Sequence, residues 1–541
     1  MTRGQPDVLT WRVTSKMKLT ILSTSDTHGY VYPTNYVKKG SHQGFGLARA
    51  ATVIAREQAA AKAEGPVITI ENGDFLEGSP LAYYVARVRP ERDPQPLMSI
   101  YNQIDYDCGI LGNHEFNYGQ AYLQGAIRDA KRTILCANIL DQNGDPEYGQ
   151  PYKIIEKDGL KIGVLGLTTQ AVYKWEKATN ISGLQFESAF IAAKKYVPII
   201  KKQADIVVVC YHGGFERDLS TGQPNDIHVG ENEAYHILEA IPGIDALVTG
   251  HQHRQLATNV FDIPTTQPGF RGQAVGKITL DLRRDDAGHV SVINHDSELV
   301  FTKDAPLDPK VIAAADDLNT EVGHWLDQPL GHIQGDMTFD DPFAARMRET
   351  PYIEFIQKVQ MATMGADISA TALFNDEARG FENPITMRNI MTNYVYPNGL
   401  SLLNITGADL KAAMEVSARY FSVKDHQIVV NPAFIHPKRR QYNYDMYEGV
   451  NYRLNIAKPV GQRVENLTYH GQPVEPDQPL RIVLNQYRAV GGGHYSMFDA
   501  SKIVAEGQGG MSEIIADYLQ EHPIIDATTN DNFSVVNDPQ A

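Results

Sequence analysis

The chain has 541 residues, a length that exceeds one compact hydrophobic core and indicates two or more domains. Apolar residues make up 42% and charged residues 21%, which is the balance of a globular protein and excludes a disordered or collagen-like chain. The formal net charge of −16 opposes binding of nucleic-acid polymers through a broad basic face, and no apolar run is long enough for a membrane-spanning helix.

The N-terminal segment carries scattered charges and lacks the apolar core and the cleavage site of a signal peptide. We expect residues 1–16 to be an extension and the protein to be cytoplasmic as the sequence stands, or periplasmic or secreted if an export signal has been removed. Three cysteines are too few for a disulfide framework. Cys108, Cys136 and Cys210 each lie among apolar residues, so we expect them in the core.

The segment 17–307 repeats one pattern, in which a short β-rich run ends in polar residues that include His, Asp or Asn. Strands are predicted at 18–25, 67–71, 108–111, 160–167, 206–211 and 246–249. Helical patterns at 47–62 and 189–202 alternate with them, which favours a layered α/β fold. Because the functional residues of such sheets collect beyond the carboxyl ends of the strands, we expect the polar clusters to meet at one edge.

The chain changes character near residue 300. Pro306 and Pro309 interrupt it, and the apolar spacing over 310–326 predicts one helix, so 308–328 is assigned as a linker helix. The remainder, 329–541, is predicted to form a second α/β domain. Its expected helices cover 353–364, 407–420 and 511–520, and its expected strands cover 450–456 and 480–484.

Two of the polar clusters are pairs with the chemistry of metal ligands. Asp26-x-His28 and His251-x-His253 follow predicted strands, and residues i and i+2 of an extended segment project to the same side. A single histidine at a strand end is more often a cap or a surface group. Five clusters at five strand ends instead favour a shared metal site with seven ligands: Asp26, His28, Asp74, Asn113, His212, His251 and His253.

Seven ligands exceed the needs of one tetrahedral zinc and suit two ions that share a carboxylate. Two divalent ions about 3.5–4 Å apart can clamp the attacking and leaving oxygens of an in-line displacement at phosphorus. The donor set contains no thiolate and suits Mn²⁺, Zn²⁺, Fe or Co, among which the sequence does not choose. We assign Asp26, His28, Asp74 and His253 to the first ion, and Asp74, Asn113, His212 and His251 to the second.

In order along the chain, Asp26-x-His28, Gly73-Asp74, Gly112-Asn113-His114-Glu115, His212 and Gly250-His251-x-His253 resemble the signature of calcineurin-type metallophosphoesterases. The segment LGNHEFNYG (111–119) and the C-terminal half resemble the 5′-nucleotidase and 2′,3′-cyclic-nucleotide phosphodiesterase family. The resemblance implies a four-layered α/β/β/α metallophosphoesterase domain over 17–307. It also implies that the C-terminal α/β domain over 329–541 binds the nucleotide substrate.

The same resemblance implies that His114 is catalytic and lies above the metals, where it stabilises the transferring phosphoryl group or protonates the leaving oxygen. Asn113 then serves as substrate contact as well as ligand. In the 5′-nucleotidase branch an Asp three residues after this histidine orients it. Here that position is Asn117, which accepts a hydrogen bond but carries no charge. Because N-Y-G occurs at this place in the cyclic-nucleotide branch, the change indicates a subfamily.

By resemblance, Tyr444 and Tyr495 fall where two aromatic residues stack against the base, with Tyr487 and Tyr452 as competitors. The alternative is that these tyrosines are core or rim residues, since the chain has 27 tyrosines. The glycine run 491–493 is interpreted as room for the backbone to approach a ligand. Three residues of polar loops could also face substrate or simply lie at the surface: Asn375, Arg379 and Asn398.

The expected function is a two-metal hydrolase of nucleoside phosphates, a 2′,3′-cyclic-nucleotide 2′-phosphodiesterase with 3′-nucleotidase activity that works by in-line attack of a metal-bound hydroxide. A 5′-nucleotidase or UDP-sugar pyrophosphatase on the same scaffold is the first alternative. A non-catalytic nucleotide-binding or surface protein is an alternative of another class. The expected partner is a small-molecule nucleotide, and the oligomeric state stays open.

Overall fold

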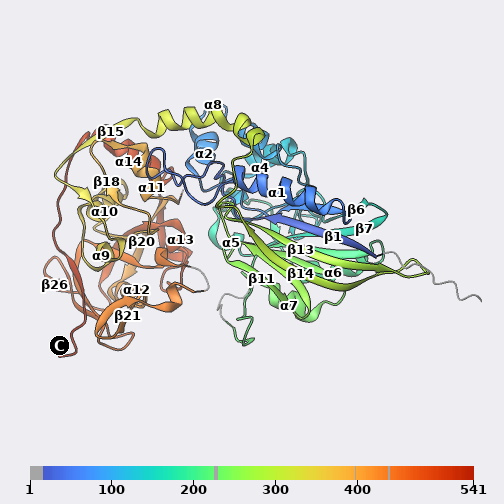
Figure 1. The fold of residues 1–541 in the computed structure, drawn as a ribbon. Helices are drawn as coiled ribbons and strands as arrows, with labels where there is room; N and C mark the ends of the chain where they lie inside the picture. Colours follow the sequence, from blue (N-terminus) through green and yellow to red (C-terminus); the bar gives the residue numbers. More distant parts are fainter. Residues whose placement is uncertain (1–15, 225–229, 397, 437–438, 541) are drawn as a thin grey trace, which may run out of the picture.

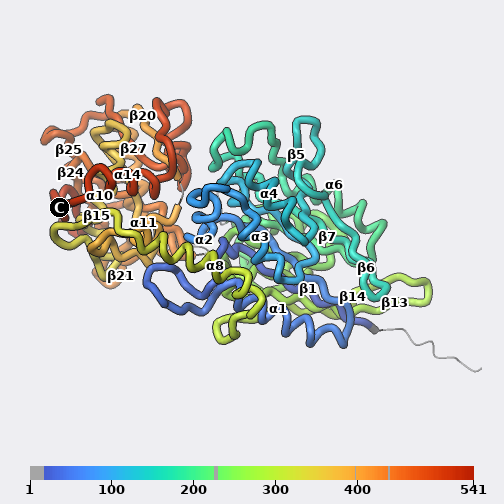
Figure 2. The backbone as a smooth tube through the Cα atoms, turned by 90° about the horizontal axis from the view of Figure 1, so that it is seen from above, coloured from blue at the N-terminus to red at the C-terminus, as the bar shows by residue number. Residues whose placement is uncertain are grey.

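The computed structural model describes residues 16–224, 230–396, 398–436 and 439–540. Two α/β domains lie side by side, and the helix α8 (Pro309–Leu326) runs along the top of both (Figure 1). Seen from above, α8 leads from the helices of the N-terminal domain to β15 (Pro329–Gln334) of the C-terminal domain (Figure 2). Residues 1–15 of the predicted extension lie outside the described residues.

Two six-stranded sheets form the middle of the N-terminal domain. The first has the order β14-β13-β1-β2-β3-β4, in which β1 to β4 run parallel. Its strands are β1 (Lys16–Thr24), β2 (Val67–Glu71), β3 (Cys108–Ile110), β4 (Thr133–Leu135), β13 (Ala274–Arg284) and β14 (Val290–Phe301). The second has the order β11-β12-β10-β9-β7-β6. Its strands are β6 (Tyr152–Lys157), β7 (Leu160–Thr168), β9 (Ile206–His212), β10 (Ala246–Thr249), β11 (Gln255–Val260) and β12 (Ile263–Pro268).

Helices cover the outer face of each sheet, which confirms the predicted four layers. Those on the first sheet include α1 (Leu47–Ala61), α2 (Pro80–Tyr83), α3 (Gln95–Tyr101) and α4 (Gln120–Asp129), and those on the second are α6 (Ala189–Lys201) and α7 (Ala234–Ala240). The strands are apolar on both faces because both are covered. Val207 and Val209 of β9 face the helices, while Val208 and Cys210 face the other sheet.

The cysteines lie in the core, as expected. Cys108, Cys136 and Cys210 are each 0% exposed, and burial raises the pKa of Cys108 to about 12. The thiols are therefore structural groups without nucleophilic character at neutral pH.

The main sheet of the C-terminal domain has the order β23-β17-β27-β20-β28. Its strands are β17 (Ile368–Ala372), β20 (Leu400–Thr406), β23 (Asp445–Glu448), β27 (Pro479–Asn485) and β28 (Ile503–Glu506). A second sheet contains β24 (Val450–Asn455), β25 (Val464–Tyr469), β26 (Gln472–Pro473) and β30 (Phe533–Val536), and a third contains β15, β19 (Ile385–Thr386) and β29 (Ile524–Asp526). The helices are α9 (Pro342–Met347), α10 (Pro351–Met364), α11 (Met387–Asn393), α12 (Gly407–Ala418), α13 (Gln486–Ala489) and α14 (Met511–Glu521).

Short paired strands complete both domains: β5 (Ile139–Leu140) with β8 (Gln185–Phe186), β16 (Met337–Thr338) with β18 (Gly380–Phe381), and β21 (Phe421–Lys424) with β22 (Gln427–Val430).

Polar contacts join the two domains beside the carboxyl ends of the strands. Glu377 of the C-terminal domain accepts hydrogen bonds from Arg271 (3.2 Å) and from the side chain of Asn35 (3.2 Å) of the N-terminal domain. Arg388 of α11 donates to the backbone carbonyl of Tyr36 at 2.9 Å. The carboxyl end of β1 points toward the C-terminal domain (Figure 1), so the interface lies next to the predicted polar edge.

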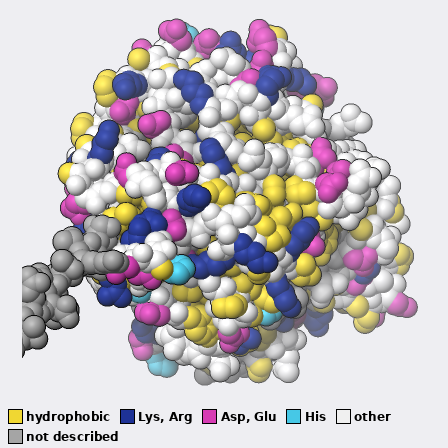
Figure 3. Space-filling model, turned by 90° about the vertical axis from the view of Figure 1, so that its right-hand side faces the viewer, with side chains coloured by type: hydrophobic (Ala, Val, Ile, Leu, Met, Phe, Trp, Pro, Cys, Tyr) yellow, Lys and Arg dark blue, Asp and Glu magenta, His cyan; other side chains and the backbone are white. Residues whose placement is uncertain are grey.

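The charged side chains on the surface are distributed as the acidic composition of the chain leads one to expect (Figure 3). On the face shown in Figure 3, basic and acidic side chains are interspersed and do not gather into one basic surface. Among the described residues, no helix is both long enough and apolar enough to cross a membrane.

The helix α8 packs against α1, α2, α3 and α11, and its last turn carries an aromatic anchor. Trp325 is 9% exposed and its ring stacks on Tyr83 at 6.0 Å. We predict that Trp325→Ala lowers the free energy of unfolding by about 3–5 kcal/mol, because it removes a buried ring and leaves a cavity. Denaturant unfolding followed by circular dichroism measures this loss. The exposed Thr320→Ala on the same helix serves as control, and equal midpoints for the two variants would contradict the prediction.

Candidate functional site

The structure brings all seven predicted ligands together at the carboxyl ends of β1, β2, β3, β9 and β10. Five of them have a left-handed backbone, which costs energy for residues other than glycine and is found mostly where function requires it. Their φ angles lie between 51° and 66°, at Asp26, His28, Asp74, His251 and His253.

The glycines of the motifs make room for this crowding. A Cβ at Gly73 would lie 2.6 Å from Nδ1 of His212, and a Cβ at Gly112 would collide with the carboxylate of Asp74. A Cβ at Gly250 would lie 2.9 Å from Oδ2 of Asp26. These glycines are therefore required by the packing of the ligands themselves.

Asp26, His28 and His253 form the first group of candidate ligands, with one donor atom of each within 4.8 Å of the others. Nε2 of His253 lies 3.4 Å from Oδ1 of Asp26 and 3.1 Å from Nε2 of His28. The carboxylate of Asp26 also accepts the backbone N–H of His251 at 3.0 Å, which ties β1 to β10.

Asp74, His212 and His251 form the second group by the same measure. Oδ2 of Asp74 lies 3.0 Å from Nε2 of His212 and 4.0 Å from Nε2 of His28. Nδ1 of His251 lies 2.9 Å from Oδ1 of Asn113. Asp74 therefore lies between the two groups, as a shared ligand must.

The donor set fits a pair of cations. His28 and His212 each place Nδ1 next to a backbone carbonyl, that of Glu77 (2.9 Å) and that of Asn72 (2.6 Å). A carbonyl only accepts, so each Nδ1 carries a proton and each Nε2 is the nitrogen that faces the site. At His212 this Nε2 faces the carboxylate of Asp74, an arrangement that is favourable only with a cation or a proton between the two atoms.

The pKa values reflect the same crowding. Burial raises the pKa of Asp74, but His212 and the other nearby histidines outweigh it, and the pKa lies well below its usual range. Burial lowers the pKa of His212, but Asp74 and Asp26 raise it to about 10. Burial lowers the pKa of His28 to about 4, so its imidazole is neutral and able to bind a metal at neutral pH.

Glu115 is a buried carboxylate whose role the sequence reasoning did not identify. It is 0% exposed and accepts the backbone N–H groups of Asp74 (2.8 Å), Phe75 (2.8 Å) and Gly112. It thereby joins the loop after β2 to the loop after β3. Its place directly after His114 in the motif was the available signal.

His114 lies beside the metal ligands with part of its ring exposed. Its backbone N–H donates to Oδ1 of Asp74 (2.8 Å), and its Nδ1 contacts Oδ1 of Asn117 (2.7 Å) and Oε2 of Glu77 (3.0 Å). Burial lowers the pKa of His114, but Asp74, Glu77 and the hydrogen bond to Asn117 raise it to about 10. Cations in the adjacent site would lower that value again, because like charges repel.

Two aromatic side chains and one acid contact His251 and His253, which follow β10, and sequence reasoning missed all three. Trp175 stacks on the ring of His251 at 5.7 Å, and Phe270 stacks on the ring of His253 at 4.8 Å. Glu231 contacts Nε2 of His251 at 3.1 Å. These contacts orient the two imidazoles.

The structure does not support the prediction that Tyr444 and Tyr495 stack against a base. Both side chains are 0% exposed in the core of the C-terminal domain. The hydroxyl of Tyr444 donates to the carbonyl of Arg346 (2.8 Å), and its ring stacks on Tyr420 at 5.1 Å. The guanidinium carbon of Arg488 lies 3.8 Å from the ring centroid of Tyr495. Protein atoms therefore cover the ring faces that a base would need.

Of the two competitors, Tyr452 is 5% exposed and stacked on Phe533, whereas Tyr487 is half-buried. Two further half-buried tyrosines lie near Tyr487. Tyr442 lies 6.5 Å from the ring of Tyr487 and 6.1 Å from the ring of Tyr396. We call Tyr396, Tyr442 and Tyr487 the tyrosine cluster.

The pKa values of the tyrosine cluster respond to two carboxylates of the N-terminal domain. Burial raises the pKa of Tyr396 and of Tyr487, and Tyr442 adds to both shifts. Glu77 also raises the pKa of Tyr396, and Glu231 raises that of Tyr487. These two carboxylates contact His114 and His251, so the tyrosine cluster lies on the part of the C-terminal domain within electrostatic reach of the candidate metal site.

The glycines of the run 491–493 allow side chains in and beside the tyrosine cluster to pack against the backbone. A Cβ at Gly492 would lie 2.6 Å from the ring of Tyr487, and a Cβ at Gly493 would collide with Asn443. The run therefore makes room for protein side chains, and not directly for a ligand as the sequence indicated.

The three residues of polar loops have local structural contacts. Asn375 accepts the backbone N–H groups of Glu377 (2.9 Å) and Ala378 (2.6 Å) and so stabilises a turn. The guanidinium of Arg379 is exposed and donates to the carbonyl of Ala378, while Asn398 is half-buried.

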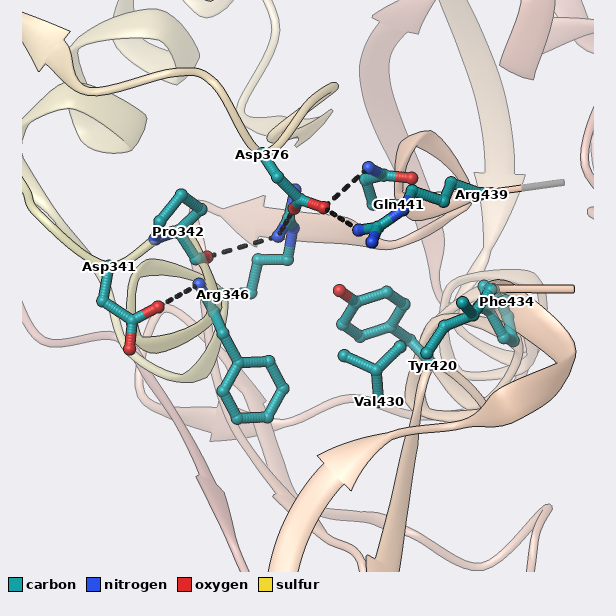
Figure 4. A pocket seen from close by; sticks show the side chains of 11 residues that line it. Asp341, Pro342, Arg346, Asp376, Tyr420, Val430, Phe434, Arg439 and Gln441 are labelled. Carbon is teal, nitrogen blue, oxygen red and sulfur yellow. Dashed lines mark hydrogen bonds and ion pairs between the residues drawn. The ribbon is translucent and has the colours of Figure 1, made fainter. Parts of the chain in front are cut away.

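A cavity of about 250 Å³ lies in the C-terminal domain between α9 and the segment after β22. Figure 4 shows aromatic and aliphatic side chains on one side of it and Asp376 on the other. Asp376 is already paired with Arg346 (2.8 Å), Arg439 (2.8 Å) and Gln441 (3.0 Å). Its lining residues come from 341–441, so the cavity does not include the candidate metal ligands.

Comparisons with known proteins find two family models that match different parts of the chain. The family model described as calcineurin-like phosphoesterase matches residues 19–255, and the model described as 5′-nucleotidase, C-terminal domain, matches residues 329–500. The chain is 30% identical to the 2′,3′-cyclic-nucleotide 2′-phosphodiesterase/3′-nucleotidase of Salmonella typhimurium, over 88% of this chain and 81% of that protein.

Two further relatives extend the comparison. The trifunctional nucleotide phosphoesterase protein YfkN of Bacillus subtilis is 25% identical over 96% of this chain, which spans 39% of the length of that protein. The crystal structure of a Staphylococcus aureus protein described as a 5′-nucleotidase, in complex with alpha-ketoglutarate, superposes with a TM-score of 0.88. Its sequence is 37% identical, and the match covers 96% of this chain and 99% of that chain.

The position of Asp74 between the two groups of ligands makes it the most sensitive carboxylate of the site. We predict that Asp74→Asn reduces the bound divalent metal to less than one ion per chain and lowers turnover of a phosphodiester at least about a hundredfold, because one negative charge is lost from both ions. Elemental analysis after dialysis against Mn²⁺ or Zn²⁺ measures the metal. Asp477→Asn, an exposed position of the C-terminal domain, is the control. Two ions retained by Asp74→Asn would refute the shared-ligand assignment.

Proposed function

Since this chain belongs to the calcineurin-like phosphoesterase family and carries the 5′-nucleotidase C-terminal domain, we propose that it hydrolyses 2′,3′-cyclic nucleotides to 3′-nucleotides and then to nucleosides. It is a metal-dependent phosphoester hydrolase. In the first step water adds to phosphorus and the P–O2′ bond breaks, with a proton passing to O2′. In the second step another water adds and the bond to O3′ breaks, which releases phosphate.

The observation that carries the proposal is the position of Asp74 between the two groups of candidate ligands. Asp26 and Asp74 bring two negative charges, and the other five ligands are neutral when they bind metal. Two divalent ions would then leave a site with a net positive charge, which attracts the phosphate of a nucleotide despite the acidic surface. This donor set of His, Asp and Asn supports Mn²⁺, Zn²⁺, Fe or Co.

Two bound ions would supply Lewis-acid stabilisation of the phosphoryl oxygens and lower the pKa of the attacking water. The residues of the chain prepare the site for this. Nδ1 of His28 and of His212 are held by carbonyls, which turns both Nε2 atoms inward before any ligand binds. The carboxylate of Asp26 accepts the backbone N–H of His251, and that of Asp74 accepts the backbone N–H of His114, so both carboxylates are held in place.

His114 is the residue we propose as proton donor to the leaving oxygen. Both contacts of its ring with Asn117 and Glu77 use Nδ1, so Nε2 is the nitrogen that remains for substrate. Its backbone N–H is bonded to Asp74, which sets the ring next to the shared ligand. A proton held at Nε2 can stabilise the phosphoryl oxygens and then pass to O2′.

The tyrosine cluster is the element we propose for binding the base, in place of Tyr444 and Tyr495. Tyr396 follows α11, Tyr487 lies in α13, and the rings of both are close to the ring of Tyr442. All three side chains are half-buried. A base that enters beside them gains stacking while its phosphate reaches the metal ligands. This arrangement requires the two domains to stay together, as Arg271 and Glu377 hold them.

The proposed function predicts a defined substrate order. Purified protein with Mn²⁺, Zn²⁺ or Co²⁺ is expected to hydrolyse 2′,3′-cAMP and 3′-AMP faster than 5′-AMP or UDP-glucose, and chelation is expected to abolish activity because the attacking water loses its activation. Chromatography should detect 3′-AMP before adenosine when 2′,3′-cAMP is the substrate. Turnover of 5′-AMP and UDP-glucose alone would identify the 5′-nucleotidase or pyrophosphatase alternative. Absence of both bound metal and activity would favour a binding protein.

The tyrosine cluster predicts a separable effect on binding. Tyr487→Ala is expected to raise KM for 2′,3′-cAMP about five- to 150-fold, which corresponds to about 1–3 kcal/mol of lost stacking. Metal content and kcat should stay near wild type, because the change lies on the other domain. Steady-state kinetics and elemental analysis measure both, with Tyr469→Ala on β25 as control. An unchanged KM would exclude Tyr487 from base binding.

A further inference from the structure

The ring of His114 is held by two acceptors on the same nitrogen. Nδ1 lies 2.7 Å from Oδ1 of Asn117 and 3.0 Å from Oε2 of Glu77. Glu77 belongs to the loop after β2, whereas Asn117 belongs to the loop after β3. Both loops also carry a candidate metal ligand, Asp74 and Asn113 respectively, so these contacts tie the ring to the metal site from two sides.

The orientation of the Asn117 amide is determined by its other neighbour. Its Nδ2 donates to Oε2 of Glu176 at 2.6 Å, which leaves Oδ1 to face His114. Glu176 is itself held, because it accepts from Nδ2 of Asn180 (2.8 Å) and from the backbone N–H of Lys177 (2.8 Å). An amide oxygen and a carboxylate oxygen only accept, so Nδ1 of His114 carries a proton. It donates this proton to Oδ1 of Asn117, and the carboxylate of Glu77 pairs with the ring when the ring is protonated.

Glu77 supplies a negative charge next to His114, which the neutral amide of Asn117 does not. Its carboxylate is 6% exposed, and a hydrogen bond from a ring N–H to a buried carboxylate is stronger than one to a neutral oxygen. The turn around it is also constrained. A Cβ at Gly78 would lie 2.7 Å from Cβ of His28, and Ser79 caps α2 and bonds to the carbonyl of Gly29 at 2.7 Å. The carboxylate therefore has little freedom to leave His114.

We propose that Glu77 is a positioning residue for His114. A single acid three residues after the histidine would both orient the ring and supply a negative charge. Here the amide of Asn117 orients the ring, and the carboxylate of Glu77 supplies the charge. Glu176 orients the amide of Asn117, and that amide orients the ring of His114. The charged carboxylate of Glu77 keeps a proton on Nδ1, so that Nε2 faces the substrate. This inference rests on the proposed function, since it assigns a role within the same hydrolysis.

The first test is Glu77→Gln in the full chain loaded with Mn²⁺. An amide that replaces the carboxylate keeps the size of the side chain but removes the charge, so kcat for 2′,3′-cAMP is expected to fall about ten- to a hundredfold. KM should stay within about twofold and the metal content should equal that of wild type, since the hydrogen bond between Glu77 and the metal ligand His28 uses the backbone carbonyl of Glu77, which the substitution keeps. Loss of bound metal, or a rise in KM with kcat unchanged, would overturn the assignment.

A matched control measures the cost of removing a buried acid as such. Glu415 of α12 is 8% exposed and accepts the backbone N–H groups of Gly461 (3.1 Å) and Val464 (2.8 Å). All three residues belong to the C-terminal domain. Glu415→Gln is expected to leave kcat and KM unchanged. The same fall in kcat in both variants would show a general structural effect and would overturn the role of Glu77.

A double-mutant cycle tests whether Glu77 acts through His114. In the background of His114→Asn, the further change Glu77→Gln is expected to leave kcat unchanged within about twofold, because residues that act as a unit are not additive. An independent, multiplicative loss would overturn the inference. The outcome is separate from that of the proposed function. If wild type hydrolyses none of the nucleotides, the proposed function fails, and if wild type is active while Glu77→Gln keeps its kcat, only this inference fails.

Discussion

The structure depends on one electrostatic constraint, which is the crowding of ligand atoms around Asp74. Its carboxylate lies near histidines of both groups, and lone pairs and negative charges at these distances repel unless cations lie among them. The left-handed backbone at five ligands adds local strain. The fold sustains this arrangement because two sheets share a continuous apolar layer, so the strand ends cannot separate to relieve the repulsion.

Recognition and chemistry lie on different domains, so the interface between the domains is part of the site. Glu377 bonds to Arg271, and the residue before Arg271 is Phe270, whose ring stacks on His253. Glu77 contacts Nδ1 of His114, and its negative charge raises the pKa of Tyr396 in the C-terminal domain. A change in the relative position of the domains would therefore alter both the surroundings of the metal ligands and the space beside the tyrosine cluster.

The N-terminal domain could be predicted well because its signals are local. An apolar run that ends in a polar cluster identifies a strand and its carboxyl end, and the predicted helix over 189–202 is α6, Ala189–Lys201. The C-terminal domain was harder because its tyrosines occur in similar polar surroundings. Tyr444 and Tyr487 look alike in the sequence, yet one is enclosed beneath Tyr420 and the other lies next to Tyr442 in the partly exposed cluster.

Residue pattern alone was sufficient for the α/β class and the four layers, and it selected the seven metal-type side chains that the structure brings together as candidate ligands, because period and position along a strand are properties of neighbouring residues. Contacts between distant segments decided the rest. They placed Glu77 beside His114, Glu115 between two loops and Trp175 against His251, and they buried Tyr444 and Tyr495. Burial and choice of partner depend on which surfaces meet after folding, and no local pattern encodes that.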